Sequence, residues 1–321
     1  MYFEYIFRKI YILGLISLIM RRKLIQHGLS SLTLSLPRKW VKDKNLKKGD
    51  ELNVEESSGK LVISSEKSKS HRKIEIDLSG AGVMVKRILG AVYKTGYDEV
   101  KIRFSRPEEL EIVRTLIREQ LIGFEIISQS KEEIIIKNIS ELNFEDFDET
   151  FKRFFTVINQ VAEESSNAIE KNDFNWLKNL TFLKKEVDRY ADYCRRVINL
   201  GYSPGDKRVS PLYTLIEQLE KVSDRYKDLC QYIAEEELIL SSELKKISGE
   251  MNGFLEDFYF LFYNFSFDKI IGLGKKKEKI KGEINSAFLK CPKKEIIVVA
   301  YYDKILNLIF DLNGPLMAMR I

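Results

Sequence analysis

The chain has 321 residues, of which 44% are hydrophobic and 31% are charged, and its formal net charge is +5. This composition is typical of a globular protein and excludes a disordered or collagen-like chain, while the length favours two or three domains. The three cysteines lie far apart without a Cys-x-x-Cys motif, and there are only two histidines, so neither a disulfide framework nor a zinc motif is indicated. Cysteines of this kind favour a cytoplasmic protein.

An apolar run covers residues 11–20 at the start of the chain. It is shorter than the about 18 residues that a membrane span needs, and no small-residue cleavage site follows it, so it makes a poor secretion signal. Because Met20 directly precedes a basic cluster that begins at Arg21, we expect residues 1–19 to be an upstream extension of a protein that starts at Met20. A helix that rests on a membrane surface is the alternative interpretation.

Residues 22–63 predict a very small β-rich domain of four short strands and one helical turn. Leucines alternate with serine and threonine over residues 31–36, which is the period-two pattern of a half-buried strand. Pro37 ends that strand and suits the first position of a short helix. Turn signals at residues 48–50 and 58–59 then predict two further strands that form a hairpin. A domain of about 45 residues buries barely enough surface to offset chain entropy, so we expect it to pair with a second copy.

Positive charge is concentrated in the same segment. Residues 21–50 contain nine lysines and arginines against two aspartates, a net charge of +7, so the rest of the chain sums to −2. A dimer doubles this charge to about fourteen, which is typical of a surface that neutralises DNA phosphates and releases counterions. A basic face that is merely solvated is the alternative interpretation.

Four short motifs in residues 22–63 together resemble the swapped-hairpin domain of the AbrB/SpoVT family. In chain order they are Gln26-His27-Gly28, Ser30-Ser31, Leu36-Pro37-Arg38-Lys39-Trp40 and Leu46-Lys47-Lys48-Gly49-Asp50-Glu51-Leu52. The resemblance implies a DNA-binding homodimer, in which two chains interlace their hairpins and present basic side chains to a roughly two-fold symmetric site. The residues that we expect to contact DNA are Arg22, Lys23, Arg38 and Lys39, with Lys42, Lys44, Lys47 and Lys48 as further phosphate contacts.

A polar linker over residues 64–72 precedes a pattern in which strands and helices alternate. We expect a βαβαββ unit with strands at residues 73–78, 100–104, 124–127 and 133–136, a helix at 83–97, and a second helix between Ser105 and Gly123. Ser105 and Glu108 have the spacing of a capping box, with Pro107 in the first turn. Gly80 and Gly82 lack the rest of a phosphate-binding loop, so we expect only a strand-to-helix turn there.

From residue 145 onward, apolar residues recur at three- and four-residue spacing, which predicts one helix after another. The expected helices cover residues 146–171, 174–199, 209–236, 240–267, 268–289 and 294–319. Six antiparallel helices divide naturally into two three-helix bundles. The expected fold class is therefore multidomain and mainly α, with small β-containing domains in the N-terminal part.

The helical part resembles the PhoU family of phosphate uptake regulators, through residues 186–190 (EVDRY) on its second helix and 219–224 (LEKVSD) on its third. Archaeal-type members of that family join an AbrB-like head, a small α/β middle domain and PhoU repeats in this order. The resemblance implies four segments. They are an upstream extension at 1–20, a swapped-hairpin β domain at 21–66, a small α/β domain at 72–142, and a PhoU-like pair of three-helix bundles at 146–321.

Carboxylates on the expected second and third helices are candidate metal ligands. At about 100° per residue, Glu220, Asp224 and Asp228 lie roughly opposite the apolar stripe of their helix, so we expect them at the surface. Acids four residues apart repel each other, and a hard cation would relieve that repulsion. The PhoU resemblance implies a divalent or iron-type ion (Fe, Mg, Mn or Zn) held by oxygen ligands from two adjacent helices. The candidate ligands are Asp188, Asp192, Glu220, Asp224 and Asp228.

Asp188 and Asp192 have a second interpretation. Both share a face away from the expected core, where acids can bind a metal. However, Lys184 lies four residues before Asp188, and Arg196 lies four residues after Asp192. Ordinary helix ion pairs therefore explain both acids without a metal.

The second half of the helical part departs from the family pattern. Residues 275–278 read Lys-Lys-Lys-Glu, and residues 307–311 begin with Asn and end with Asp. Acid pairs would be expected at both places. We therefore expect metal binding, if it occurs, in the first half.

Taken together, the patterns predict a cytoplasmic transcription regulator of phosphate uptake and phosphate homeostasis. Its head would bind DNA, and its helical body would respond to a metal, to phosphate or to a partner. The alternative is a PhoU-type adaptor that regulates a phosphate ABC transporter through contact with its ATPase, while the head only dimerises. An enzyme is not expected, because the sequence has no Ser/His/Asp set, no Walker loop and no His-bearing metal motif.

Overall fold

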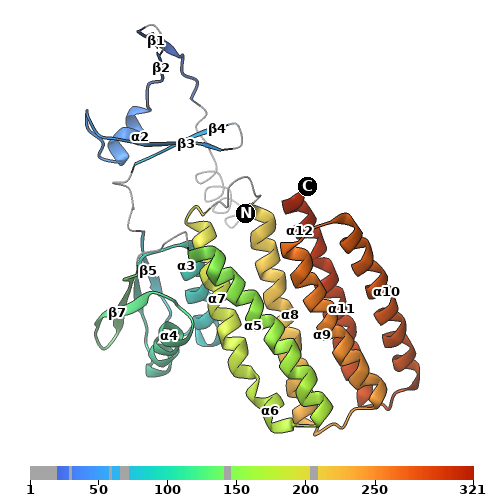
Figure 1. Ribbon diagram of the computed structural model, residues 1–321. Helices are drawn as coiled ribbons and strands as arrows, with labels where there is room; N and C mark the ends of the chain where they lie inside the picture. Colours follow the sequence, from blue (N-terminus) through green and yellow to red (C-terminus); the bar gives the residue numbers. More distant parts are fainter. Residues whose placement is uncertain (1–19, 29–30, 58–59, 66–71, 141–145, 203–208) are drawn as a thin grey trace, which may run out of the picture. The chain divides into compact units, whose positions relative to one another are not determined.

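The computed structural model describes residues 20–28, 31–57, 60–65, 72–140, 146–202 and 209–321. The chain forms two compact units that divide after Ser70 (Figure 1). The expected upstream extension, residues 1–19, lies outside the described residues. None of the helices in the described ranges combines the length with the apolar character that crossing a bilayer requires.

The first unit contains two antiparallel hairpins and one short helix. Strands β1 (Ile25–His27) and β2 (Ser31–Thr33) form one hairpin, and β3 (Asn53–Ser57) and β4 (Lys60–Ser64) form the other. Helix α2 (Arg38–Asp43) lies between them in sequence. The four strands and the helical turn expected from the sequence are confirmed, although β2 ends three residues earlier than Leu36. Pro37 is the residue before the helix and not its first residue.

The described part of the first unit has no buried apolar core. Among its described side chains no apolar residue is buried, and Leu32 and Leu61 are 60% and 69% exposed. The prediction that residues 31–36 form a half-buried strand is therefore wrong for a single chain, because the described residues leave Leu32 and Leu34 exposed and only Leu36 is half-buried. The exposed large apolar side chains among the described residues of the unit are Met20, Leu24, Ile25, Leu32, Leu34, Val54 and Leu61.

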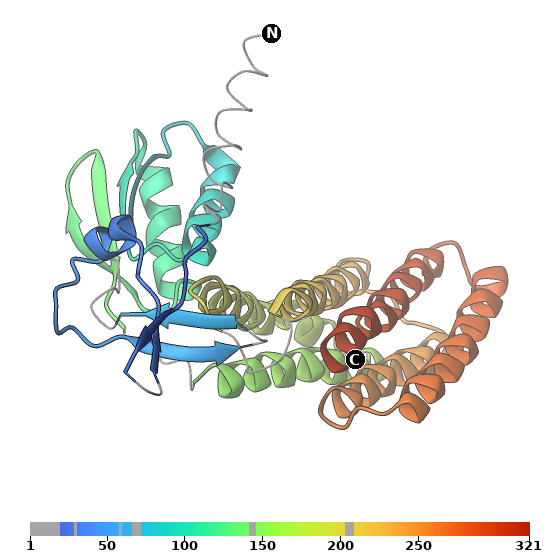
Figure 2. The same ribbon diagram turned by 90° about the horizontal axis from the view of Figure 1, so that it is seen from above.

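The second unit begins with the βαβαββ arrangement expected from the sequence. Its sheet has the order β5-β6-β8-β7, with β5 and β6 parallel and the other pairs antiparallel. The strands are β5 (Lys73–Asp77), β6 (Glu99–Arg103), β7 (Phe124–Gln129) and β8 (Glu133–Asn138). Helices α3 (Val85–Thr95), which follows the short turn η2 (Gly82–Met84), and α4 (Pro107–Glu119) cover one face of the sheet (Figures 1 and 2).

The core of this α/β domain follows from strand alternation. Val100 and Ile102 on β6 and Ile134 and Ile136 on β8 point to the same face, where all four are buried against the two helices. Their intervening neighbours are less buried, as expected when one face of a sheet is covered.

Helix α4 begins one residue later than its expected capping box. Because Pro107 is its first residue, the residue three positions after the cap is Glu109 and not Glu108. The Glu109 carboxylate accepts hydrogen bonds from the backbone N–H groups of Ser105 (3.0 Å), Arg106 (3.1 Å) and Gly80 (2.7 Å). Burial by itself would raise the pKa of Glu109, but these bonds and the Arg106 guanidinium outweigh it and lower that pKa to about 2.

The remainder of the second unit is helical. Its helices are α5 (Asp146–Lys171), α6 (Phe174–Asn179), α7 (Thr181–Asn199), α8 (Val209–Glu235), α9 (Ser242–Tyr263), α10 (Phe267–Lys290), α11 (Glu295–Asp311) and α12 (Asn313–Arg320). The expected helices 174–199 and 294–319 are each divided in two. The second division has a clear cause, because Pro315 has no N–H for the carbonyl of Asp311 and its ring crowds that carbonyl.

One continuous apolar core joins all the long helices of this body. It includes Phe154 on α5, Leu219 on α8, Phe254 on α9 and Ile305 on α11, which are fully buried. Helix α7 lies beside α3 of the α/β domain, and α10 forms the opposite edge of the helical body (Figures 1 and 2). The α/β domain and the helices belong to one compact unit but keep separate apolar cores.

Candidate functional site

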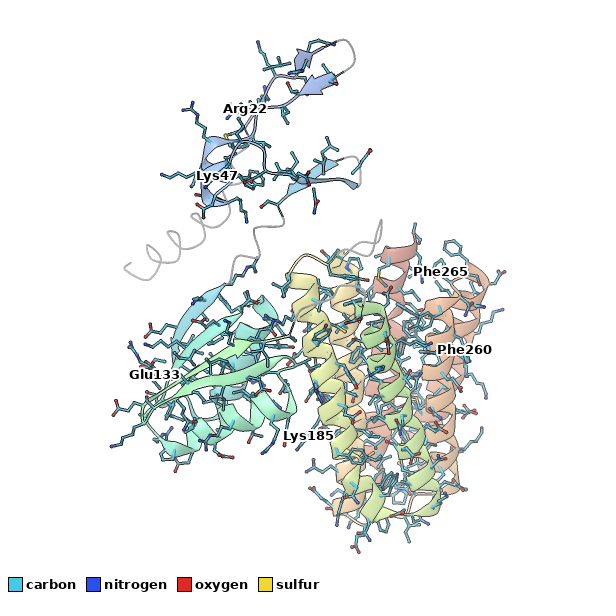
Figure 3. All side chains as sticks on the ribbon, turned by 60° about the vertical axis from the view of Figure 1, so that its left-hand side comes forward. Arg22, Lys47, Glu133, Lys185, Phe260 and Phe265 are labelled. Atoms are coloured by element: carbon cyan, nitrogen blue, oxygen red, sulfur yellow. The ribbon has the colours of Figure 1, made fainter. Side chains whose placement is uncertain are left out.

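The basic residues predicted to contact DNA are exposed on the first unit. Seven of the eight are exposed, and Lys44 is half-buried. Within the described part of the chain, none of the eight forms an ion pair with a carboxylate. Arg22 and Lys47 are labelled in Figure 3. The eight residues are Arg22, Lys23, Arg38, Lys39, Lys42, Lys44, Lys47 and Lys48.

An ordered turn carries two of these lysines. The backbone N–H of Leu46 donates to the carbonyl of Val41 (3.0 Å), and that of Lys47 donates to Asp50 Oδ2 (2.8 Å). Gly49 adopts a φ of 95°, a conformation that costs glycine little and other residues more. The turn therefore fixes the backbone around Lys47 and Lys48, a few residues after the basic helix α2, and leaves the charges of their side chains unpaired in the described ranges.

The five candidate metal ligands lie on α7 and α8, but they are not free. Lys184 of α7 forms ion pairs with Asp188 on its own helix and with Asp224 of α8, whose Oδ1 lies 3.0 Å from Nζ. Arg195 of α7 pairs with Glu220 of α8. The prediction of an uncompensated acidic ladder on α8 is therefore wrong, because cations of the neighbouring helix α7 compensate Glu220 and Asp224.

Asp228 is the ligand candidate that lies apart from these pairs. Its carboxylate is held by Arg225 of the same helix, at 3.0 Å from Nη1, and lies 3.8 Å from the ammonium of Lys227. It is partly exposed, as the sequence predicted for the whole ladder. Glu220 differs, because burial at the α7–α8 contact raises the pKa of its carboxyl group while Arg195 and Lys184 act in the opposite direction.

Asp192 lies on a covered face and not on an open one. It is 2% exposed and pairs with Arg195 at 2.9 Å and with Lys94 of α3 at 3.2 Å. The side-chain amide of Gln120, next to the end of α4, also donates to it. Asp192 does lie on a face away from the core of the helices, but the α/β domain covers this side of α7, which the sequence did not indicate.

Arg196 does not pair with Asp192, contrary to the expected helix ion pair, whereas the Lys184–Asp188 pair is confirmed. The Arg196 side chain is fully buried, and its Nη1 donates to the carbonyls of Tyr93 and Tyr97, both at 2.8 Å. Its Nη2 lies 3.1 Å from Asp98 Oδ1. Burial lowers the pKa of the guanidinium, which its partners only partly offset. Arg196 thus joins α7 to the α/β domain.

Aromatic rings complete the surroundings of Arg196. Its guanidinium carbon lies 5.0 Å from the ring centre of Tyr93 and 5.1 Å from that of Phe124. Cation–π contacts of this length are attractive, especially away from water. The sequence does carry a signal for this role, because consecutive arginines on a helix point about 100° apart and need partners on different sides.

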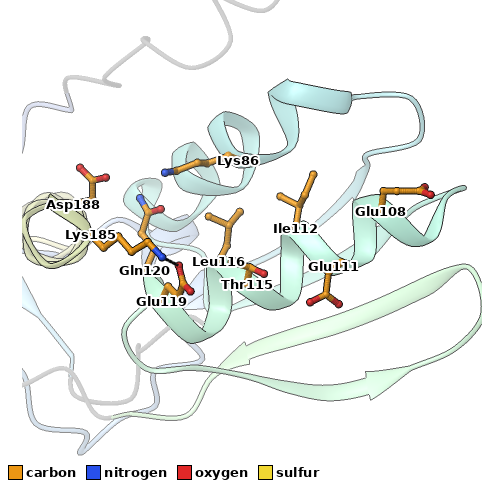
Figure 4. A pocket seen from close by; sticks show the side chains of 10 residues that line it. All are labelled: Lys86, Glu108, Glu111, Ile112, Thr115, Leu116, Glu119, Gln120, Lys185 and Asp188. Atoms are coloured by element: carbon orange, nitrogen blue, oxygen red, sulfur yellow. Dashed lines mark ion pairs between the residues drawn. The ribbon is translucent and has the colours of Figure 1, made fainter. Parts of the chain in front are cut away.

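A groove of about 450 Å³ runs along α4 where the α/β domain meets α7 (Figure 4). Ile112 and Leu116 form its apolar floor, and Lys185 of α7 crosses one end to pair with Glu119 at 2.9 Å. Its volume is in the range of small-molecule sites. The remaining lining residues are Lys86, Glu108, Glu111, Thr115, Gln120 and Asp188.

The carboxylates of α7 and α8 do not fit a metal as they are placed. Across the described ranges, no group of three or more His, Cys, Asp or Glu side chains is arranged to hold an ion. Hard divalent cations require several oxygen ligands, whereas here the oxygens face an ammonium and a guanidinium.

Comparisons of the chain with protein-family models, with curated proteins and with solved structures give no match.

Proposed function

We propose that this protein is a homodimeric transcription regulator of phosphate uptake, whose first unit binds DNA and whose helical body responds to the cell's phosphate status. The observation that carries the DNA-binding part is the set of eight basic side chains between residues 22 and 48 that have no carboxylate partner among the described residues. Unpaired cations at this density attract a polyanion, since each phosphate contact releases a condensed counterion.

The exposed leucines of the first unit support the dimer. A hairpin with its apolar side chains in water is marginal by itself, and burying them against a second copy would supply the missing core. The same pairing would bring two basic helices α2 together, which suits a DNA site of two-fold symmetry.

The phosphate-responsive part of the proposal rests on the PhoU resemblance and on the organisation of the second unit. A signal received by the helices has a direct route to the α/β domain, because Arg196, Asp192 and Lys185 of α7 all contact that domain. A contact of this kind can couple two parts when a ligand favours one arrangement over another.

Salt-dependent DNA binding by the full-length protein tests the proposal. We expect binding to a duplex of about 30 base pairs at low salt, with log K falling linearly against log salt concentration. Arg38→Ala combined with Lys39→Ala should weaken binding at least about tenfold and make the slope shallower, because phosphate contacts are lost.

The matched control is Lys290→Ala combined with Lys293→Ala, which removes two exposed lysines of the second unit. This control should leave DNA affinity unchanged. A protein that shows no affinity at low salt, or affinity without a salt slope, would instead be explained by the adaptor function, in which the head only dimerises.

A further inference from the structure

The acidic cluster between α7 and α8 already contains cations. Three carboxylates from two helices, those of Asp188, Glu220 and Asp224, act on the ammonium of Lys184. On the same contact, Arg195 pairs with Glu220 and with Asp192. The carboxylate oxygens that could bind a divalent ion therefore face cationic side chains of the protein itself.

Lys184 is held in this place by more than one interaction. Its side chain is only 8% exposed, which is unusual for lysine. Because its ammonium group pairs with both Asp188 and Asp224, a metal ion could enter only by breaking these two ion pairs.

Interhelical pairs of lysines and carboxylates also occur in the second half of the helical body, where the lysines are more exposed than Lys184. Lys279 of α10 lies 3.0 Å from Glu250 of α9, and Lys276 of α10 pairs with Asp257 of α9. Lys281 of α10 pairs with Asp303 of α11. In both halves, a lysine from one helix neutralises acids of its neighbours.

We propose that Lys184, assisted by Arg195, is the resident cation of the α7–α8 cluster and takes the place that a divalent metal would fill, so that the helical body works without a metal there. Two opposite charges brought together in a covered site attract strongly, and an internal cation needs no supply from solution. This inference rests on the proposed function only in treating the helical body as the responsive part.

Manganese titration of the full-length protein tests this assignment. The protein is stripped with EDTA, transferred to EDTA-free buffer and titrated with Mn²⁺, while free Mn²⁺ is followed by electron paramagnetic resonance. The variants are Lys184→Met, the double variant Lys184→Met with Asp224→Asn, and the control Lys185→Met. Lys185 is a suitable control because it is the next residue of α7 but pairs with Glu119.

We expect the unsubstituted protein and Lys185→Met to bind Mn²⁺ no more tightly than about 1 mM, the weak end of oxygen-ligand sites. Lys184→Met should bind one Mn²⁺ per chain at least about tenfold more tightly, because three carboxylates lose their ammonium. The double variant should return to the unsubstituted value. Lys184→Met without a gain over Lys185→Met would overturn the proposal.

A second measurement keeps the test decisive if Lys184→Met does not fold. The unsubstituted protein and Asp224→Asn are purified from medium that contains Mn, Fe and Zn, and their bound metal is measured by mass spectrometry. Equal and substoichiometric contents support the proposal, whereas one metal per chain that Asp224→Asn removes contradicts it. Neither measurement involves DNA, so failure of the DNA-binding proposal would leave this result intact.

Discussion

The first unit and the helical body differ in how their cationic side chains are placed and paired. The basic side chains of the first unit have no carboxylate partners among the described residues, whereas Lys184, Arg195 and Arg196 of the body are buried and paired. The apolar side chains differ less sharply, since Leu32 of the first unit is 60% exposed and Leu219 of the body is fully buried, but the body also exposes Phe260 and Phe267. The clearest difference is therefore that the body pairs its buried cations internally, whereas the described cations of the first unit are left to solvent.

The largest effect on the free energy of unfolding is expected at Arg196, whose buried charge is paired within the second unit. Arg196→Ala should lower the free energy of unfolding of the second unit by about 3 kcal/mol, because two carbonyls and Asp98 lose their donor and a cavity remains. Urea denaturation of the full-length protein, followed by far-ultraviolet circular dichroism, measures the change. Arg189→Ala on the exposed side of the same helix is the control and should change stability by under about 0.5 kcal/mol.

The next effect tests whether the first unit depends on a second copy. Leu32→Asp should weaken dimerisation by about 2 kcal/mol, which is roughly thirtyfold, because a charge would replace an apolar side chain buried between chains. Sedimentation equilibrium measures the monomer fraction. Ser31→Asp, one residue earlier on the other face of β2, should leave the dimer intact. A Leu32→Asp protein that remains as dimeric as the unsubstituted one would show that this face is not the interface.

A smaller effect is expected at the cap of α4, and its sign follows from the pKa of Glu109. Because that pKa is lowered to about 2 in the folded protein, the carboxylate stabilises the fold above the unfolded pKa, which is about 4.3. This stabilisation is lost as the pH falls from about 4.3 toward 2. Glu109→Gln should lower stability at neutral pH and flatten the acid dependence of the thermal midpoint in that window. An equally steep acid dependence in the variant would contradict the assignment.

The smallest effect is expected for an exposed ion pair. Arg153 lies four residues after Glu149 on α5 and pairs with it at 2.6 Å, and both side chains are mostly in water. Arg153→Ala should change the free energy of unfolding by no more than about 0.5 kcal/mol. Urea denaturation under the conditions used for Arg196→Ala allows direct comparison. A loss of unfolding free energy similar to that of Arg196→Ala would mean that burial does not decide how much an arginine contributes to the stability of this protein.

Local sequence patterns predicted most of the secondary structure. Helix α5 covers the expected residues 146–171, and the βαβαββ order of the α/β domain is as predicted, because hydrophobic periodicity and turn residues act over a few neighbours. The capping residue of α4 was misplaced by one position. Caps depend on where the first helical turn closes, which sequence spacing determines only to within a residue or two.

The candidate metal site illustrates what sequence reasoning missed. Helical spacing placed Glu220 and Asp224 correctly relative to each other, but on α8 alone nothing indicates that Lys184 and Arg195 lie opposite them. These four residues come from two helices separated by the loop between α7 and α8. Their ion pairs exist only because packing of the apolar stripes brings the two helices into contact.

By itself, the amino-acid sequence determined the order of strands and helices, the basic character of residues 21–50 and the apolar stripes of the long helices. These are properties of neighbouring residues, and they need no distant contact. Only the tertiary structure decided which charges are paired, that Asp192 and Arg196 are buried, and that Leu32 and Leu61 of the first unit are exposed. Pairing and burial depend on which elements meet in space, and that follows from packing of the whole chain and not from spacing along it.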